Sequence, residues 1–403
     1  MILPILCLAG ASLVISFLAT WFIIHLAPRI GFVDKPGHRK IHAAPKPLGG
    51  GVAIVIALAL PMFGAIVAFS YYERAAYVVT MRGAPTHAEA QALVNADELQ
   101  RALHGGVLRQ TPLALTLLAA TLVLHILGLF DDFRALGPYV KLVVQLVAAS
   151  VLVVSFREMR ILTTLGKMPS IALTILWIVA ITNAFNFLDN MDGLSAGVAA
   201  VCTTAFLITA VVIQQWFVAA TLALLLGALL GFLYWNFPPA RIFMGDSGSL
   251  VIGFVLGVLT VRTTYLPKDE DFAAGWYSVF APLIVLAVPL YDLIVVSVIR
   301  LSRGKSPFVG DTNHFSHRLV ARGMSRRTAV LSIYLVTAAT SVAAILLPHM
   351  KSTFGAMLIF AQTLLILGVV ALLEQHPLPV RDAEDARAVP PLPPKEGRGE
   401  GGV

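Results

Sequence analysis

Residues 171–201 read IALTILWIVAITNAFNFLDNMDGLSAGVAAV, two apolar runs joined by a polar turn. A helix that spans a bilayer needs roughly 20 mostly apolar residues, and both runs approach that length. The polar residues between them are Asn183, Asn186, Asp189, Asn190 and Asp192. Because acidic side chains at the end of a membrane helix are costly to desolvate, such a cluster is usually functional. The stretch therefore predicts a membrane protein with a functional site at one end of its helices.

The rest of the chain repeats this apolar pattern. Of its 403 residues, 58% are hydrophobic and only 13% are charged, which excludes an ordinary soluble enzyme. We expect an all-α, polytopic integral membrane protein with about eleven transmembrane helices. The predicted spans are Ile2–Ile24, Val52–Ser70, Pro112–Phe130, Val140–Phe156, Ile171–Phe187, Ala196–Ile213, Phe217–Trp235, Ser249–Val261, Tyr277–Ile299, Ala329–Leu347 and Thr353–Leu373.

The charged residues suggest how these helices are oriented. The formal charge of +7 comes from lysines and arginines that flank apolar runs, so we expect contact with membrane lipids and not with nucleic acid. Basic residues concentrate in 29–51 and 300–327, which the positive-inside rule places in the cytoplasm. The N-terminus is then outside and the C-terminus inside. Cys7 and Cys202 both lie in apolar runs, which excludes a disulfide framework or a thiolate metal site.

The chain divides into one large domain and two peripheral segments. Residues 1–374 form the predicted multi-span domain, and residues 71–110, where acidic and basic residues balance, form its predicted external loop. Residues 375–403 are rich in proline, glycine and charge, so this tail cannot bury a core and is predicted to be disordered.

Five polar clusters punctuate the membrane domain. They are Asp34–His42, Asp131–Asp132, Asn183–Asp192, Asn236–Asp246 and Arg303–His317. Each is separated from the next by an even number of predicted spans, so all five face the same side. The basic bias makes that side the cytoplasm. We therefore expect a single site at the cytoplasmic surface of the membrane.

The acidic members of these clusters indicate a metal site. They are Asp131, Asp132, Asp189, Asp192 and Asp246. Carboxylates that converge on one point repel each other unless a cation neutralises them. Oxygen ligands without cysteine favour Mg²⁺, or Mn²⁺, over zinc. The alternative is that single acids merely pair with Arg134, Lys141 or Arg241.

The basic members supply the complementary half of a phosphate site. Arg39, Lys40, His42, Lys141, Arg303, His314 and His317 are candidates to hold phosphate oxygens or move a proton. Phosphoryl transfer needs this arrangement because its catalysis is mostly positioning and charge neutralisation. Phe243 is either an interfacial anchor or a platform on which a base stacks. His125, inside an apolar run, is read as a satisfied interior histidine.

Five motifs at these positions resemble those of the polyprenyl-phosphate N-acetylhexosamine-1-phosphate transferases, glycosyltransferase family 4, which includes WecA, TagO and MraY. In order, they read VDKPGHRKIHAAPKPLGGG, LGLFDDFRALGPYVK, NAFNFLDNMDGLSAG, FPPARIFMGDSGS and PLYDLIVVSVIRLSRGKSPFVGDTNHFSH. The resemblance implies an enzyme that moves a sugar-1-phosphate from a UDP-N-acetylhexosamine to a polyprenyl phosphate, such as undecaprenyl phosphate. UMP is released, and a lipid-linked envelope glycan is begun. A second copy of the chain is kept as a candidate partner.

The resemblance also assigns roles by position. The implied metal ligands are Asp246 and Asn186. The implied catalytic residues are Asp131, Asp132, Asp189 and His317. The implied substrate-binding residues are Arg39, Lys40, His42, Lys141, Asn183, Asp192, Phe243, Arg303 and His314, with Asp192 and Phe243 at the uracil.

Two motif positions depart from the family pattern. Asn190 stands where a glycine is usual, and Ser316 stands where a histidine is common. Because the last loop lacks consecutive histidines, the resemblance favours a WecA-like GlcNAc-1-phosphate transferase over the phospho-MurNAc-pentapeptide transferase of peptidoglycan synthesis. An ion-coupled transporter and a non-catalytic scaffold are the alternatives of other classes.

Overall fold

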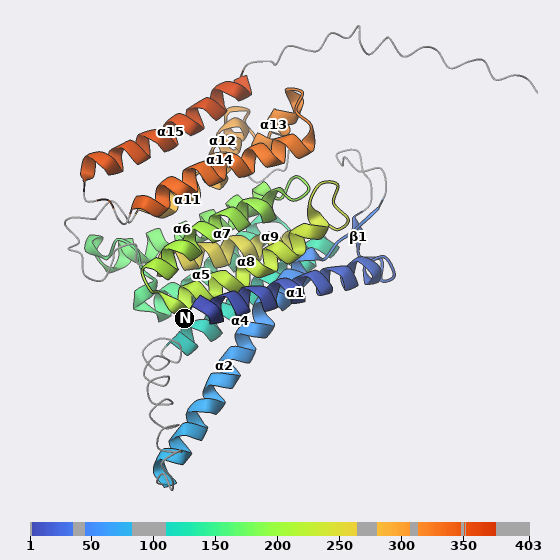
Figure 1. The fold of residues 1–403 in the computed structure, drawn as a ribbon. Coiled ribbons are helices and arrows are strands. Elements are labelled where there is room, and N and C mark those ends of the chain that lie inside the picture. Colours follow the sequence, from blue (N-terminus) through green and yellow to red (C-terminus); the bar gives the residue numbers. More distant parts are fainter. Residues whose placement is uncertain are drawn as a thin grey trace, which may run out of the picture.

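The computed structural model describes residues 2–34, 45–82, 110–263, 280–306, 313–347, 350 and 352–375. The described chain is built almost entirely of helices (Figure 1). The first half contains α1 (Ile2–Leu26), α2 (Gly50–Arg82), α4 (Thr111–Phe133), α5 (Pro138–Ser155), α6 (Lys167–Leu188) and α7 (Leu194–Val212). The second half contains α8 (Trp216–Asn236), α9 (Asp246–Arg262), α11 (Ala281–Val285), α12 (Ala287–Ser302), α13 (Phe315–Ala321), α14 (Arg326–Leu346) and α15 (Thr353–Gln375). Two short strands, β1 (Val33–Asp34) and β2 (Lys46–Pro47), pair antiparallel.

The helices confirm a polytopic membrane protein. In the part of the chain that the structure describes, nine helices are long and apolar enough to cross a bilayer. The two other predicted spans correspond to α9, which has 17 residues, and to the pair α11 and α12, which is interrupted at Leu286. The predicted count of about eleven spans and the orientation of the termini remain predictions.

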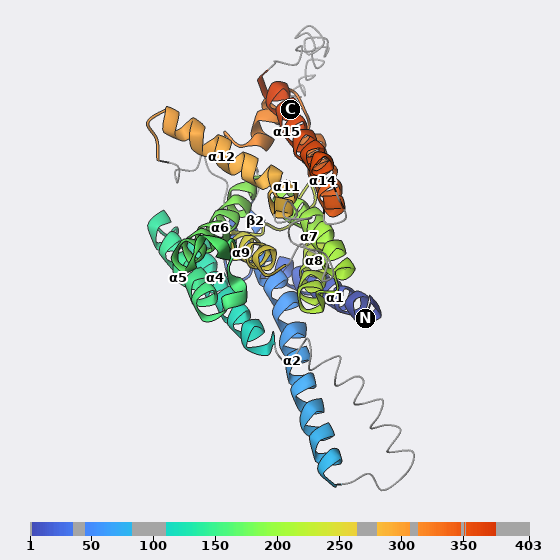
Figure 2. The same ribbon diagram turned by 90° about the vertical axis from the view of Figure 1, so that its left-hand side faces the viewer.

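Helix α9 lies at the centre of the bundle. It packs mainly between α4 and α6, and α2, α7 and α8 also contact it (Figure 2). All of its residues from Ser247 to Val261 are buried. Gly128 allows the close approach of α4, because a Cβ at this position would lie 2.4 Å from the backbone nitrogen of Ser247. Small residues are what close packing of membrane helices requires.

Helix α1 is fixed to α8 in a similar way. The buried hydroxyls of Ser12 and Ser16 each donate a 2.6 Å hydrogen bond to a backbone carbonyl of α8. Gly227 and Gly231 on α8 face the α1 backbone, where a Cβ would clash. The first predicted span is therefore an integral part of the bundle.

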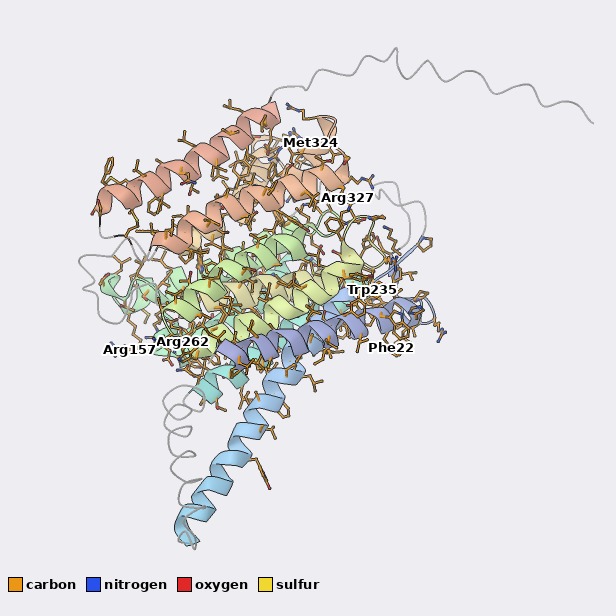
Figure 3. All side chains as sticks on the ribbon, viewed as in Figure 1. Phe22, Arg157, Trp235, Arg262, Met324 and Arg327 are labelled. Atoms are coloured by element: carbon orange, nitrogen blue, oxygen red, sulfur yellow. The ribbon has the colours of Figure 1, made fainter. Side chains whose placement is uncertain are left out.

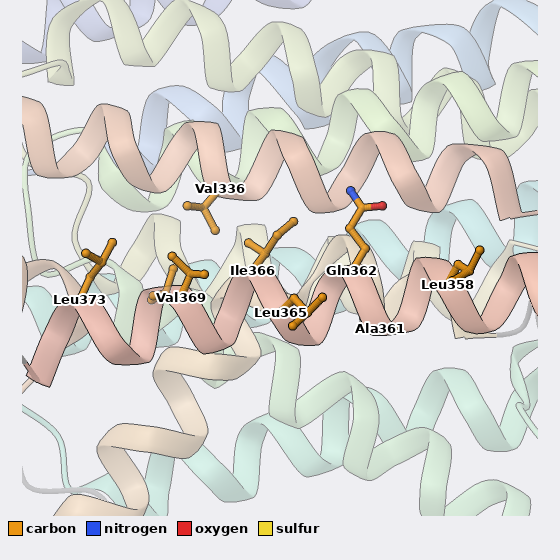
Figure 4. A pocket seen from close by; sticks show the side chains of 9 residues that line it. Val336, Leu358, Ala361, Gln362, Leu365, Ile366, Val369 and Leu373 are labelled. Carbon is orange, nitrogen blue, oxygen red and sulfur yellow. The ribbon is translucent and has the colours of Figure 1, made fainter.

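Helices α12 to α15 form an outer layer against this bundle (Figure 1). A groove along α14 and α15 is lined almost entirely by apolar side chains, with Gln362 among them (Figure 4). On α15, Leu364, Leu365 and Val369 are largely exposed. Exposed apolar side chains on a span of this length fit contact with lipid tails.

One boundary differs from the sequence-based expectation. Helix α2 continues to Arg82, so the predicted external loop 71–110 begins as a helical extension and not as a loop. Residues 83–109 and the tail from residue 376 lie outside the described part of the chain. Both cysteines are free, Cys7 exposed and Cys202 buried.

Candidate active site

The predicted site residues gather at one end of the helical bundle. Trp235 and Arg327 lie at this end, whereas Arg157 and Arg262 lie at the opposite end (Figure 3). Helix α9 begins with Asp246 and ends with Arg262, so Asp246 belongs to the first group. Hydrogen bonds join members of four of the polar clusters, and Asp34 of the remaining one pairs in the two-stranded sheet with Lys46, which lies 3.7 Å from Asp192. The prediction that these clusters share one side is confirmed for their described members.

A lysine bridges two carboxylates at the centre of the site. The ammonium of Lys141, at the start of α5, lies 3.1 Å from Oδ2 of Asp131 and 2.8 Å from Oδ2 of Asp246. Asp131 sits near the end of α4, and its other oxygen accepts a 2.7 Å hydrogen bond from the amide of Leu136. Three helices thus contribute one group each to a compact charged centre. Its side chains are only 14–25% exposed, which strengthens their interaction relative to water.

Asp132 plays a different part from its neighbour. Its Oδ1 accepts a 2.8 Å hydrogen bond from the backbone amide of Asp246, and its Oδ2 accepts one of 3.2 Å from the amide of Ser247. These amides are among the unpaired donors at the start of α9, where a carboxylate is favoured. Gly245 leaves the space for it, since a Cβ there would meet the carboxylate of Asp132 at 2.4 Å. Asp132 therefore fixes the position of Asp246. Its predicted catalytic role stays a prediction.

The two asparagines of α6 face different neighbours. Asn186 donates 2.9 Å hydrogen bonds to Oδ1 of Asp246 and to the hydroxyl of Ser249. Asn183, one turn earlier, donates to Gln145 of α5 at 2.6 Å and to a carbonyl of its own helix. Asn186 is thus part of the charged centre, whereas the amide nitrogen of Asn183 ties α6 to α5.

Asp189 follows the end of α6 and lies in a field of like charge. Burial is the main cause that raises the pKa of Asp189 well above the usual range. The nearby carboxylates of Asp246, Asp132 and Asp192 raise it further. Carboxylates that raise the pKa of a neighbour in this way mark a place where a cation or a proton is favoured.

Asp192 and Phe243 form a second part of the site. Oδ2 of Asp192 accepts a 2.9 Å hydrogen bond from the amide of Ala240 and lies 3.7 Å from the ammonium of Lys46. The same ammonium sits 5.1 Å from the centre of the Phe243 ring, a cation–π distance. Lys46 lies in β2 and pairs with Asp34 in β1. A charged residue and a ring are therefore adjacent, as recognition of a base would require.

The outer helices supply a third part of the site. His314 donates from Nδ1 to Oδ2 of the buried Asp292 at 2.8 Å, and Oδ1 of Asp292 accepts from the amide of Phe315 at 2.7 Å. Nη2 of Arg300 lies 3.4 Å from Nε2 of His314. Because arginine is only a donor, this contact places the His314 proton on Nδ1.

The other predicted residues of this segment lie around His314. The ring centres of His317 and His314 are 6.4 Å apart. Arg303 directly follows α12, and its guanidinium donates to Oδ1 of Asn313 at 3.3 Å.

Three predicted site residues lie outside the described part of the chain, and three residues of the site were not predicted. Arg39, Lys40 and His42 lie outside the described residues. Lys46, Asp292 and Arg300 were not predicted as site residues, although all three fall within the quoted motifs. The signal that could have identified Asp292 and Arg300 is a buried acid and a buried base on one short apolar helix, since buried charges are almost always paired.

The site lacks a preformed metal cage but has suitable donors for one ion. Within the described ranges, no three His, Cys, Asp or Glu side chains are grouped closely enough to enclose a metal. Mg²⁺ is usually held by one or two carboxylates together with substrate phosphates. The carboxylates around Asp246 and the amide of Asn186 fit this chemistry, and the like charges of Asp246, Asp132 and Asp192 around Asp189 favour a cation.

Comparisons with known proteins agree with this site. The sequence model described as "Glycosyl transferase family 4" matches residues 114–264. A decaprenyl-phosphate N-acetylglucosaminephosphotransferase of Mycolicibacterium smegmatis is 33% identical over 80% of this chain and 77% of its own length. A probable undecaprenyl-phosphate N-acetylglucosaminyl 1-phosphate transferase of Bacillus subtilis is 29% identical over 87% of this chain and 86% of its own length. A phospho-N-acetylmuramoyl-pentapeptide-transferase of Desulforudis audaxviator is 37% identical, but over only 34% of this chain and 41% of its own length. The chain is therefore a member of glycosyl transferase family 4, among the polyprenyl-phosphate sugar-1-phosphate transferases.

Proposed function

We propose that this protein transfers GlcNAc-1-phosphate from UDP-GlcNAc to a polyprenyl phosphate. The main support for this proposal is the bridge from Lys141 to Asp131 and Asp246. An ammonium group held between two acids at a membrane surface is well placed to bind the oxygens of a diphosphate. The relatives that align over most of the chain are named for N-acetylglucosaminyl phosphate transfer. The muramoyl-pentapeptide relative aligns over a third of it, which leaves that alternative less supported.

The proposed reaction is a single displacement at phosphorus. An oxygen of the lipid phosphate forms a bond to the phosphorus that carries the sugar. The bond from that phosphorus to the oxygen shared with the uridine-bearing phosphate breaks, and UMP leaves with the electron pair. Lys141 neutralises charge on the phosphate oxygens. The raised pKa of Asp189 suits it to take a proton from a singly protonated lipid phosphate.

The remaining residues position the two substrates. Asp192 and Phe243 are proposed to hold the uracil by hydrogen bonding and stacking, displacing Lys46 from the ring. His317 and Arg303 are proposed to contact the sugar or the diphosphate. Mg²⁺, held by Asp246 and Asn186 together with phosphate oxygens, would supply charge neutralisation at the diphosphate. Mn²⁺ is expected to substitute for it.

We propose that the site lies at the cytoplasmic face of the cell membrane. Arg303, Arg326 and Arg327 follow or begin helices near the site, and positive charge is retained on the cytoplasmic side. A water-soluble nucleotide sugar would then arrive from the cytoplasm while the lipid acceptor stays in the bilayer. The product would begin a lipid-linked glycan of the cell envelope.

The direct test is UMP release by the purified protein in detergent or nanodiscs. UDP-GlcNAc, undecaprenyl phosphate and MgCl₂ should together yield UMP and a lipid-linked sugar diphosphate, and omission of any one should stop the reaction. A panel that includes UDP-GalNAc and UDP-MurNAc-pentapeptide identifies the sugar. Turnover only with the pentapeptide donor would replace GlcNAc in the proposal, and absence of UMP with every donor would reject the proposed activity.

A further inference from the structure

A hydrogen bond joins α13 to the turn between α6 and α7. The hydroxyl of Ser316 donates to Oδ1 of Asn190 at 2.5 Å, across 126 positions of sequence. The amide nitrogen of Asn190 donates in turn to the carbonyl of Phe187 at the end of α6, at 2.7 Å. Both ends of the Asn190 amide are therefore used, and Ser316 is only 1% exposed. The burial of Ser316 shields this part-buried bond to some extent from competition by water.

These partners are the two positions at which the motifs depart from the family pattern. A glycine at position 190 would have no side chain to accept from Ser316, and a hydroxyl at position 316 is of a size to reach Asn190. That the two departures contact each other indicates that they function as a pair.

The bond completes a junction whose other contacts come from α12. Asp292 holds both the ring of His314 and the amide of Phe315, which fixes the first residues of α13 to α12. Arg300 lies 4.9 Å from the Phe187 ring, and His314 meets the same ring edge-on at 5.9 Å. The ring contacts are weakly directional, whereas the bond from Ser316 to Asn190 fixes one position of α13 relative to the turn.

The location of the pair gives it a consequence for the site. Asn190 directly follows Asp189 and lies two residues before Asp192, and Ser316 directly precedes His317. We propose that Ser316 and Asn190 are a pair of positioning residues that hold His317 in register with Asp189 and Asp192 during transfer. This role rests on the proposed function, since it assigns no new chemistry.

The pair should influence turnover more than nucleotide binding. Loss of a neutral hydrogen bond costs about 0.5–1.5 kcal/mol, which corresponds to roughly a 2- to 12-fold change in rate. We expect Ser316→Ala and Asn190→Gly each to lower kcat by about 3- to 10-fold. We expect the double variant to be no slower than the slower single variant, because each substitution removes the same bond. The Kd of Ser316→Ala for UMP should stay within about twofold of the unsubstituted value, because the hydrogen bond of Ser316 is made to Asn190 and not to a residue proposed to hold the uracil.

The control is another buried serine. Ser341 on α14 is 3% exposed, and its hydroxyl has no hydrogen-bond partner among the residues that the structure describes. Ser341→Ala should leave kcat unchanged. Multiplicative effects of the two substitutions on kcat would overturn the proposal, and so would a loss of UMP affinity that matches the loss of turnover.

A second measurement tests the link without turnover. Hydrogen–deuterium exchange of the backbone amides in peptides covering 313–321 should accelerate in Ser316→Ala and in Asn190→Gly, but not in Ser341→Ala. Unchanged exchange in both variants would refute the link. If the unsubstituted protein releases no UMP, the proposed function fails. If exchange still accelerates in the two variants, the link between α13 and the turn is supported, but without a role in transfer.

Discussion

Replacement of Lys141 by methionine is the sharpest test of the charged centre. Methionine keeps much of the length of the side chain but removes the ammonium, so the carboxylates of Asp131 and Asp246 lose the cation between them. Each hydrogen bond to a charged group contributes about 1.5–3 kcal/mol, and Lys141 makes two, at 3.1 and 2.8 Å. The sum is about 3–6 kcal/mol by the same measure.

Water reduces this loss, because the three side chains are 14–25% exposed and the freed carboxylates can be partly hydrated. We therefore take the lower end, about 3 kcal/mol, which corresponds to a fall in kcat/KM of roughly 100-fold. The assay is the initial rate of UMP release, normalised to the folded fraction found by thermal unfolding. Lys167→Met is the matched control, because Lys167 begins α6 at the opposite end of that helix from Asn186 and is exposed. If Lys141→Met keeps more than a third of the normal rate, the bridge has no part in transfer.

The other predictions concern the supports of this centre. Asp132→Asn places an amide nitrogen against the backbone donors of α9, so the free energy of unfolding should fall by about 1–3 kcal/mol. An unfolding midpoint equal to that of the unsubstituted protein would contradict this. Gly128→Ala forces a Cβ to 2.4 Å from the α9 backbone and should lower the yield of folded protein. Gly64→Ala should not, because a Cβ at position 64 meets no described atom within 4 Å. Size-exclusion profiles of the two variants compare them directly. Because the pKa of Asp189 is raised in the folded state, the ligand-free protein should lose stability as pH rises above the ordinary carboxyl value of 3.8, and Asp189→Asn should flatten this slope in unfolding midpoints measured across pH. Removal of Mg²⁺ by EDTA should abolish UMP release and its return should restore it; full turnover in EDTA would reject a metal role.

The location of the site could be predicted because it depends on topology. Counting spans places every second connection on one side, and the contacts of Lys141, Asn186 and Lys46 bear this out. The prediction needed only the lengths of apolar runs and the positions of polar residues. His125 was also read correctly as a satisfied interior residue, since its Nδ1 lies 2.9 Å from the carbonyl of Ser247.

The division of labour within the site could not be predicted. Asp131 and Asp132 are adjacent in sequence, yet one faces Lys141 and the other caps α9, because successive side chains of a helix point in directions about 100° apart. Asp292 and Ser316 were missed as supporting residues since their partners are distant in sequence. The helical continuation of α2 to Arg82 was missed because residues 71–82 are polar enough to resemble a loop.

The burial of α9 sets an order on the assembly of this protein. With 17 residues it is about 25 Å long at 1.5 Å per residue, less than the roughly 30 Å of a hydrocarbon core. All of its residues from Ser247 to Val261 are covered by protein, so the nascent helix gains its surroundings only once α4 and α6 are in the membrane. Asp246, the first residue of α9, therefore reaches its place in the site only when α9 packs against these helices. A partly synthesised or misassembled chain would therefore contain several complete spans but lack Asp246 in its place. Only the complete bundle would then act on the lipid phosphate.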